Sequence, residues 1–455
     1  MVDKQPGSGR NINTNQISHT RKMTKPANYN AVKPMTSRQL RGTVSLPDTR
    51  KKQTEPRGFL GFFKKFIKPK AVVEINRYKE GVDRIFLMLV IIMLCLGTIM
   101  VFSASYAYAL QNFGDSYYYV EKQILMAVLG LVAMILAACL VDYLLLEKLA
   151  GIFFIVTLAL NFATPIWGIV SKGAKRWFTI FGIQFQPSEL LKFAVVLLFA
   201  YYISKTGDKF KKYKLGLFPP LIVMAAIGVA MLLQSHNSGL IIIILICVAM
   251  MYIGDAPKMI FVVGFAAAVL LVFLTVNYNE TVVKILVDVT GKEYAGDRLI
   301  YWLDPFKDPA DKGYQIIQSL YAIGSGGLTG LGWGQSRQKY LFLPEPQNDF
   351  IFAIICEEMG FIGAILIIAL FVVLIWRGFV IAYHAPNKFS SFVVMGITIK
   401  VAIQFLLNIA VVTNTIPNTG ISLPFFSYGG TALIMLMGEM GVILSISRYS
   451  LHEKP

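Results

Sequence analysis

Ten apolar runs constrain the fold of this chain more than any other feature of its sequence. Runs of about 18 or more apolar residues predict membrane-spanning helices, because an unpaired backbone amide costs several kcal/mol in hydrocarbon and a helix pairs its own amides. Only 15% of the residues are charged, against about 25% in soluble domains. We therefore expect an all-α polytopic membrane protein with ten transmembrane helices. The runs lie near 85–106, 124–141, 149–168, 190–204, 216–233, 239–254, 258–276, 350–375, 391–412 and 429–447.

The distribution of charge predicts the orientation of these helices. Residues 1–84 hold 19 Lys and Arg against 6 Asp and Glu, which is +13 of the total net charge of +17. Because cytoplasmic flanks are rich in Lys and Arg, we expect the N-terminus in the cytoplasm. Ten crossings return the C-terminus to the same side, where the basic connection 204–216 also falls. The long loop 278–349, between the seventh and eighth helices, is then extracytoplasmic.

The segments outside the membrane domain have distinct compositions. Residues 1–56 are too poor in large apolar side chains to fold alone and predict a disordered basic cytoplasmic tail. The tail has no RNA-binding signature, so nucleic-acid binding is not expected. Residues 57–83 predict an amphipathic juxtamembrane segment, in which Phe side chains lie opposite Lys and Arg; a loose linker is the alternative. The membrane domain covers 84–449, and 450–455 form a cytoplasmic C-terminal tail.

Common nucleotide and metal motifs are missing from the sequence. The glycine-rich "GSGGLTGLGWG" (324–334) lacks the P-loop Lys and a preceding strand, so a flexible or tightly packed loop beneath a lipid headgroup fits better. The four His are far apart in sequence and suggest no metal site. ATP-driven transport is therefore not expected, and the function should lie in the outward loops and the helix ends that they join.

The first outward segment, "SKGAKRWFTIFGIQFQPSELLK" (171–192), places three residues, Lys175, Arg176 and Trp177, in a loop before the fourth helix. Ser188 or Glu189 could cap that helix. Glu189 and Lys192 are three residues apart and can meet on one helix face. This pair either locks helix packing or marks a substrate path, since ionisable residues inside a membrane are costly.

Acidic residues gather where the long loop meets the eighth apolar run. Glu345 and Asp349 precede the run, and Glu357 and Glu358 lie inside it. On a helix Glu357 lies about 12 Å deeper than Asp349 and is turned by about 80°, and Glu358 is turned by about 180°, so neither can pair with Asp349. The two glutamates are interpreted as structural or cavity-lining. Their candidate partners are Lys192 and Lys400. Asp349 itself is either an N-cap or a catalytic base.

Several long motifs, in order, carry a family resemblance. They are "FSAS" (102–105), "FQPSELLK" (185–192), "GYQIIQSLYAIGSGGLTGLGWGQSRQKYLFLPEPQNDFIFAIICEEMG" (313–360) and "PNTGISLPFFSYGGTALI" (417–434). With ten spans, they resemble the SEDS family of cell-wall polymerases, the group that includes FtsW, RodA and SpoVE, over about residues 80–449. "SRQKYLFLPEP" is more similar to the FtsW branch than to RodA. One departure is "QSHNSG" (234–239), where His236 replaces the acid of a Pro-Asp-Leu-Gly turn.

The resemblance implies an enzyme that polymerises lipid II into glycan strands outside the bacterial inner (plasma) membrane and releases undecaprenyl pyrophosphate. Its essential acid maps onto Asp349, and its motif Trp maps onto Trp177. Such a reaction needs one base near the headgroups and cations for the pyrophosphate. The cations are Lys or Arg of the outward loops, Arg298 among them, or a divalent ion; no other cofactor and no metal ligand is predicted. The substrate-binding candidates are Lys175, Arg176, Trp177, Gln186, Ser188, Glu189, Lys192, Arg337, Lys339 and Glu345.

Other functions remain open at this point. Ten helices with intramembrane charges also suit a lipid II flippase or another transporter, although no inverted repeat is visible and the polar motifs cluster on one side. A scaffold that only recruits a transpeptidase would not need Asp349. The resemblance also implies a partner, a class B penicillin-binding protein, and neighbours from the divisome or elongasome. Division is the first choice of process, and elongation or sporulation is the alternative.

Overall fold

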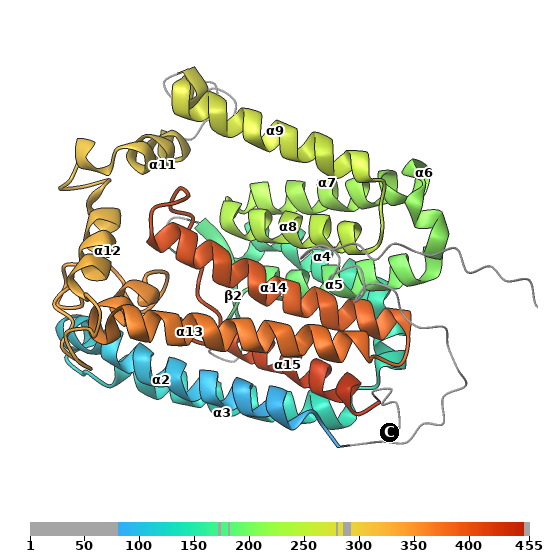
Figure 1. Cartoon of the computed structure of the whole chain (residues 1–455), viewed down its shortest axis with the longest axis horizontal. Helices are drawn as coiled ribbons and strands as arrows, with labels where there is room; N and C mark the ends of the chain where they lie inside the picture. Colours follow the sequence, from blue (N-terminus) through green and yellow to red (C-terminus); the bar gives the residue numbers. More distant parts are fainter. Residues whose placement is uncertain (1–80, 172–173, 181–182, 279–280, 285–292, 450–455) are drawn as a thin grey trace, which may run out of the picture. The chain divides into compact units, whose positions relative to one another are not determined.

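The structure is a computed structural model that describes residues 81–171, 174–180, 183–278, 281–284 and 293–449. The tail 1–56, residues 57–80 of the predicted amphipathic segment 57–83, and the C-terminal residues 450–455 lie outside the described residues. Long helices dominate the described part, as expected (Figure 1). They are α2 (Arg84–Phe113), α3 (Tyr118–Leu140), α4 (Tyr143–Trp167), α5 (Pro187–Thr206), α7 (Phe218–Leu233), α8 (Asn237–Ile253), α9 (Lys258–Asn277), α13 (Ile351–Tyr383), α14 (Lys388–Val412) and α15 (Gly430–Ser447).

Each of the ten apolar runs coincides with one of these helices or extends at most two residues beyond it. Nine helices of the described part are long and apolar enough to cross a membrane, and α8, with 17 residues, is shorter. The chain is therefore a multi-pass membrane protein, whereas the count of ten spans stays a prediction. Shorter elements lie between the helices: α6 (Tyr213–Gly216), α11 (Glu293–Leu303), α12 (Tyr314–Ser325), and the 3-10 helices η2 (Gly207–Lys211) and η3 (Pro305–Lys307).

The best-buried helices are α5, α14 and α15, and they form the centre of the bundle. In the packing, α15 contacts α3, α14 contacts both α13 and α5, and α4 contacts α5. By contrast, α9 is almost entirely exposed and is separated from α14 by α7 and α8 (Figure 1). Apolar side chains without protein neighbours are expected where a helix faces lipid. The core therefore lies between α2, α5, α13, α14 and α15.

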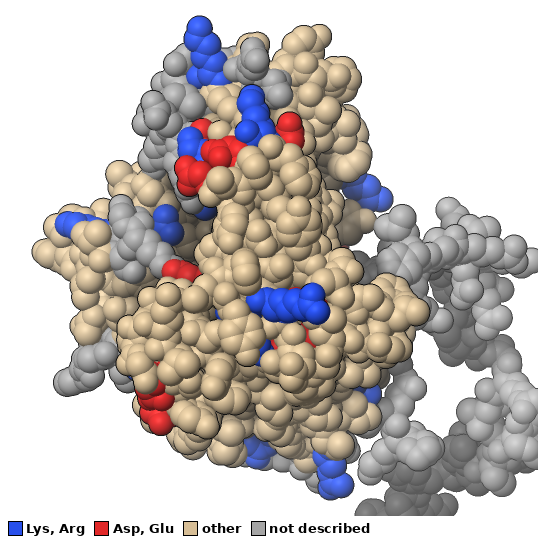
Figure 2. All heavy atoms as spheres, turned by 90° about the vertical axis from the view of Figure 1, so that its left-hand side faces the viewer, with Lys and Arg blue, Asp and Glu red and all other residues tan. Residues whose placement is uncertain are grey.

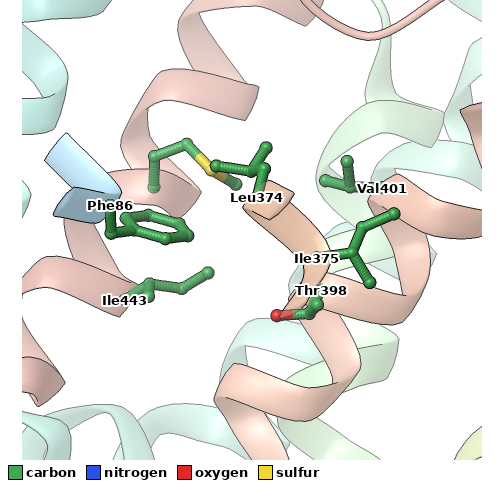
Figure 3. A pocket seen from close by; sticks show the side chains of 7 residues that line it. Phe86, Leu374, Ile375, Thr398, Val401 and Ile443 are labelled. Atoms are coloured by element: carbon green, nitrogen blue, oxygen red, sulfur yellow. The ribbon is translucent and has the colours of Figure 1, made fainter. Parts of the chain in front are cut away.

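A small gap remains in this core between α2, α13, α14 and α15 (Figure 3). It has a volume of about 10 Å³, roughly that of one water molecule. The only hydroxyl on its wall, that of Thr398, donates to the carbonyl of Val394 at 2.8 Å. The gap offers no polar partner to a ligand, so it is a packing defect and not a functional site.

The helix ends at one side of the bundle carry most of the loops, and we call this side the loop end. It comprises β1 (Ile169–Ser171), β2 (Ala174–Ile180), β3 (Ile183–Phe185), α11, α12 and the segments 326–350 and 413–429. Figure 2 shows it as a largely uncharged surface on which acidic and basic side chains occur in separate small groups. The positive-inside argument predicts that this end faces outward.

Two local expectations at the loop end are wrong. Lys175, Arg176 and Trp177 lie in β2, the middle strand of an antiparallel three-stranded sheet, and not in a loop. The strand is favoured by its aromatic and β-branched residues and by pairing on both sides. Ser188 and Glu189 do not cap α5, because the helix begins earlier, at Pro187, with Gln186 in the N-cap position. Proline suits the first helical position because its missing N–H needs no partner there.

Candidate functional site

Asp349 lies at the loop end, two residues before α13, and is partly exposed. The N-cap position belongs to Phe350, which is buried and makes no side-chain capping bond. The capping alternative for Asp349 therefore fails. The contacts that hold the backbone of Asp349 come from neighbouring elements.

Segment 413–429 holds the backbone around Asp349. The Asn408 amide, at the end of α14, donates to the carbonyl of Asp349 at 2.8 Å. Ser427 Oγ donates to the carbonyl of Asn348 at 2.6 Å, and the amide of Tyr428 donates to the carbonyl of Gln347 at 2.8 Å. Because these bonds use backbone atoms of residues 347–349, they fix the chain without consuming the Asp349 carboxylate.

Segment 413–429 is in turn bound to α11. The guanidinium of Arg298 donates to the carbonyl of Asn418 at 2.6 Å. Trp302 Nε1 donates to the carbonyl of Asn414 at 3.1 Å, and Asn414 Nδ2 returns a bond to the carbonyl of Trp302 at 3.2 Å. Helix α11 and segment 413–429 therefore form one hydrogen-bonded unit.

A pocket of about 330 Å³ opens beside this unit. One part of its wall is polar and carries Arg298, Asn237 and Asn418, and the rest is apolar. The apolar lining comes from Ile241, Leu299, Leu407, Ile416, Pro417 and Ile421. Thr419 and Ile421 line the pocket on either side of Gly420, and a Cβ at Gly420 would lie 3.0 Å from Asp349 Oδ2. Asp349 itself does not line the pocket, but its carboxylate lies against the segment that does. The pocket, with one polar and one apolar wall, suits a molecule with an anionic head and an apolar tail.

Glu357 and Glu358 bind segment 325–343 instead of the predicted lysines. Glu358 pairs with Lys339 at 2.9 Å and accepts from Ser103 Oγ at 2.7 Å. Glu357 accepts from the amide of Arg337 at 2.9 Å and from the hydroxyl of Ser336. Both carboxylates are almost fully buried. The structural interpretation holds, but Lys192 and Lys400 are the wrong partners, because they pair with Glu189 and Glu439 at 2.7 and 2.6 Å.

The glycine-rich loop packs tightly against the same turn of α13. The amide of Leu331 donates to the carbonyl of Glu357 at 2.9 Å, and that of Gly332 to the carbonyl of Glu358 at 3.0 Å. A Cβ at Gly330 would collide with the Glu358 carbonyl, and Gly360 kinks α13 with φ +66° at this contact. The amides of residues 331 and 332 thus serve the fold, which argues against a phosphate cradle.

The residues predicted around the first outward segment form a separate group on β2 and α5. Arg176 donates to the carbonyls of Gln234 and Ser235 in the turn between α7 and α8. Glu189 and Lys192 meet as expected, and the Lys192 side chain is buried. Of the others, Lys175 is exposed, Trp177 and Gln186 are half-buried, and Ser188 is buried with a hydroxyl that makes no hydrogen bond in the described structure.

The remaining candidates lie in segment 326–350, which leads to Asp349. Glu345 accepts from Asn348 Nδ2 at 2.9 Å and is therefore beside the segment that carries Asp349. Arg337 is exposed, whereas Lys339 is buried with its ammonium held by Glu358. A role for Lys339 in substrate binding stays a prediction, and it would require this ion pair to open.

His236, which departs from the family motif, is buried at the start of α8. Burial lowers its pKa to about 4, and the charges of Arg176 and Lys192 add to this effect. The ring is therefore neutral at pH 7. Groups of three or more His, Cys, Asp or Glu that could hold a metal ion do not occur among the described residues.

Sequence reasoning missed Asn408, Asn418 and Gly420. Asn408 is a buried amide inside an apolar run, and this signal was visible in the sequence because polar groups in a membrane are costly. Its contacts were not visible, since it is 59 residues from Asp349.

The chain matches a known protein family over most of its length. A family model described as "Cell cycle protein", that of FtsW, RodA and SpoVE, matches residues 83–452. The chain belongs to this family of polytopic membrane proteins. Stage V sporulation protein E of Bacillus subtilis (strain 168) is 39% identical over 82% of this chain and 98% of its own length. A probable peptidoglycan glycosyltransferase FtsW of Geobacter sp. (strain M18) is 37% identical, also over 82% and 98%.

Solved structures share the fold. One, described as "Structural coordination of polymerization and crosslinking by a peptidoglycan synthase complex", contains a chain with a TM-score of 0.64 and 26% identity. The alignment covers 81% of this chain and 98% of that one. The rod shape determining protein RodA of Thermus thermophilus has a TM-score of 0.58 and 22% identity, over 82% and 98% of the two chains. The helical membrane fold is thereby confirmed.

Proposed function

We propose that this protein is a peptidoglycan glycosyltransferase that polymerises lipid II into glycan strands and releases undecaprenyl pyrophosphate. The observation that carries the proposal is the position of Asp349, a partly exposed carboxylate beside a pocket with Arg298 at its polar side and apolar side chains elsewhere. A polyprenyl pyrophosphate combines an anionic head with an apolar chain, which matches the two kinds of wall. Relatives named probable peptidoglycan glycosyltransferase support the assignment.

The chemistry requires one base and one cationic site. The 4-hydroxyl of the incoming sugar attacks the anomeric carbon of the lipid-linked strand, and Asp349 takes the hydroxyl proton. The bond from the anomeric carbon to the pyrophosphate oxygen breaks, and the pyrophosphate leaves with the electron pair. Arg298 is near enough to the pocket to stabilise that charge. The base must come within about 3 Å of the hydroxyl.

The cellular setting is also part of the proposal. The protein is placed in the bacterial plasma membrane with both termini in the cytoplasm, so that the loop end and Asp349 face outward. A class B penicillin-binding protein is the expected partner, and a solved peptidoglycan synthase complex with a related chain supports this. Septal wall synthesis is the first choice of process; a relative named for sporulation keeps that alternative in view.

The decisive experiment is Asp349→Asn in the full-length chain with purified lipid II. General-base catalysis contributes about 10²–10⁴-fold, so polymerisation should fall by that factor. The fold and partner binding should remain, because Asn408 and Ser427 hold backbone atoms that the substitution keeps. The matched control is Asp115→Asn, which removes an exposed carboxylate between α2 and α3 and should leave activity unchanged.

Two results would refute the proposal. Glycan strands of normal yield from Asp349→Asn would remove the base. A wild-type chain that moves labelled lipid II across vesicle membranes but never polymerises it, with or without its transpeptidase, would identify a flippase instead.

A further inference from the structure

Asp349 needs a support that its own helix does not provide. A capping residue is held by the first turn of its helix, but here that position belongs to Phe350 and no side chain caps α13. A general base must nevertheless keep one orientation, because misplacement by about 1 Å can cost 100-fold in rate. The support must therefore come from a neighbouring element, and segment 413–429 and the end of α14 are in contact with Asp349.

Asn408 supplies the first contact. Its side chain is fully buried, and the two hydrogens of Nδ2 are both used. One is donated to the carbonyl of Asp349 at 2.8 Å and the other to the carbonyl of Ile421 at 2.7 Å. The Oδ1 atom is buried and makes no hydrogen bond among the described residues. The side chain thus acts as a double donor that ties Asp349 to the pocket-lining segment.

Gly420 supplies the second contact. Its backbone has φ +64°, a left-handed conformation that favours glycine. A Cβ at this position would lie 3.0 Å from Asp349 Oδ2 and 3.8 Å from Asp349 Cγ. The first of these is closer than normal van der Waals contact. The missing side chain therefore leaves room for the carboxylate against the wall of the pocket.

We infer that Asn408 and Gly420 are positioning residues for Asp349, the first fixing its backbone and the second fixing the direction of its carboxylate. The inference rests on the proposed role of Asp349 as base. Neither residue reacts with substrate. Asn408 and Gly420 lie 59 and 71 residues beyond Asp349, so the end of α14 and segment 413–429 together hold the base.

Gly420→Ala tests the carboxylate contact, and Gly114→Ala is its matched control. Gly114 caps α2 with φ +71°, and a Cβ there would meet no atom within 4 Å. Both substitutions impose similar left-handed strain, so both should lower the melting temperature in detergent by a similar amount. Only Gly420→Ala adds a methyl group against Asp349. The methyl group displaces Asp349 Oδ2 by a few tenths of an ångström, so we expect kcat on purified lipid II to fall about 5-fold relative to Gly114→Ala, with KM changed less than about twofold.

Asn408→Asp tests the backbone contact and keeps the inference falsifiable if Gly420→Ala folds poorly. The substitution nearly preserves size but replaces the Nδ2 donor with an acceptor that faces two carbonyl oxygens. Asn161→Asp makes the same exchange elsewhere, because Asn161 Nδ2 donates to the carbonyls of Thr157 and Pro187 at 2.8 and 3.2 Å. The Asn161→Asp variant therefore measures how much stability an Asn-to-Asp exchange costs at a buried double donor that does not contact Asp349. At matched folded protein, kcat should fall in Asn408→Asp by about the same factor as in Gly420→Ala.

Three outcomes are distinguishable. A kcat loss in Gly420→Ala and Asn408→Asp at unchanged KM supports the inference. If Asp349→Asn is inactive while Gly420→Ala polymerises as fast as Gly114→Ala, the positioning role is overturned and the proposed function stands. If Asp349→Asn polymerises normally, the proposed function fails and the positioning role fails with it.

Discussion

Two regions at the start of α13, only eight or nine residues apart, use carboxylates in opposite ways. Asp349, just before the helix, is partly exposed, and the surrounding hydrogen bonds bind its backbone. Glu357 and Glu358, inside the helix, are buried and their oxygens are occupied by Lys339, Ser103 and the amides of segment 336–338. The two buried glutamates support the fold through these contacts, whereas Asp349 is a partly exposed carboxylate at the loop end.

The largest expected effect within this comparison comes from breaking the Lys339–Glu358 pair. Lys339→Ala leaves the charge of Glu358 buried without its counter-ion, and loss of one partner of a buried pair costs about 3–5 kcal/mol. The melting temperature in detergent should drop sharply, and segment 325–343 should become accessible to protease. The double variant Lys339→Met with Glu358→Met should regain much of the loss. A Lys339→Ala protein that melts like the wild type and shows only a raised KM would instead place Lys339 in substrate binding.

His236 extends the comparison to a buried group that carries no charge at neutral pH. Its pKa of about 4 lies below the ordinary value of about 6.5, so the folded state binds fewer protons between these two values. The contribution of neutral His236 to the free energy of unfolding is therefore fully present above about pH 6.5. It is lost as the pH falls towards 4, and the loss amounts to about 3 kcal/mol. Thermal melting of wild type and His236→Asn across this range should show a steeper acid loss in the wild type. Parallel curves would contradict the assignment.

The smallest effect is expected from Glu357→Gln. The substitution keeps the shape of the side chain but removes the negative charge that accepts from the Arg337 amide and the Ser336 hydroxyl. Hydrogen bonds to a charged group contribute about 1.5–3 kcal/mol, so stability should fall by about that amount. Lipid II polymerisation at matched folded protein should be unchanged. A large loss of kcat with intact stability would move Glu357 from the structural region to the reactive one.

Much of the fold followed from local sequence. The ten apolar runs match ten helices, and the Glu189–Lys192 contact followed from a spacing of three residues on one helix. The position of Asp349 just before the N-terminal end of a helix could also be predicted from the sequence. The β2 strand was not, because its pairing with β1 and β3 depends on neighbours that a loop-like composition of Gly, Lys and Ser conceals.

The partners of the buried charges could not be assigned in the same way. The sequence offered Lys192 and Lys400 as partners of Glu357 and Glu358, and Lys339 was assigned to substrate binding instead. Only the packing of segment 325–343 onto α13 selects Lys339. The same holds for Asn408, whose contact with Asp349 depends on how α14 meets α13.

The sequence by itself determined that this protein is a membrane-embedded helical bundle with Asp349 just before the N-terminal end of one helix. The physical reason is local, since every stretch in hydrocarbon must satisfy its own backbone, and helices do so within about 20 residues. The tertiary structure decided which carboxylates are buried in ion pairs and hydrogen bonds and which is partly exposed at the loop end. That choice depends on contacts between residues from about 20 to 70 positions apart in sequence, which no local pattern encodes.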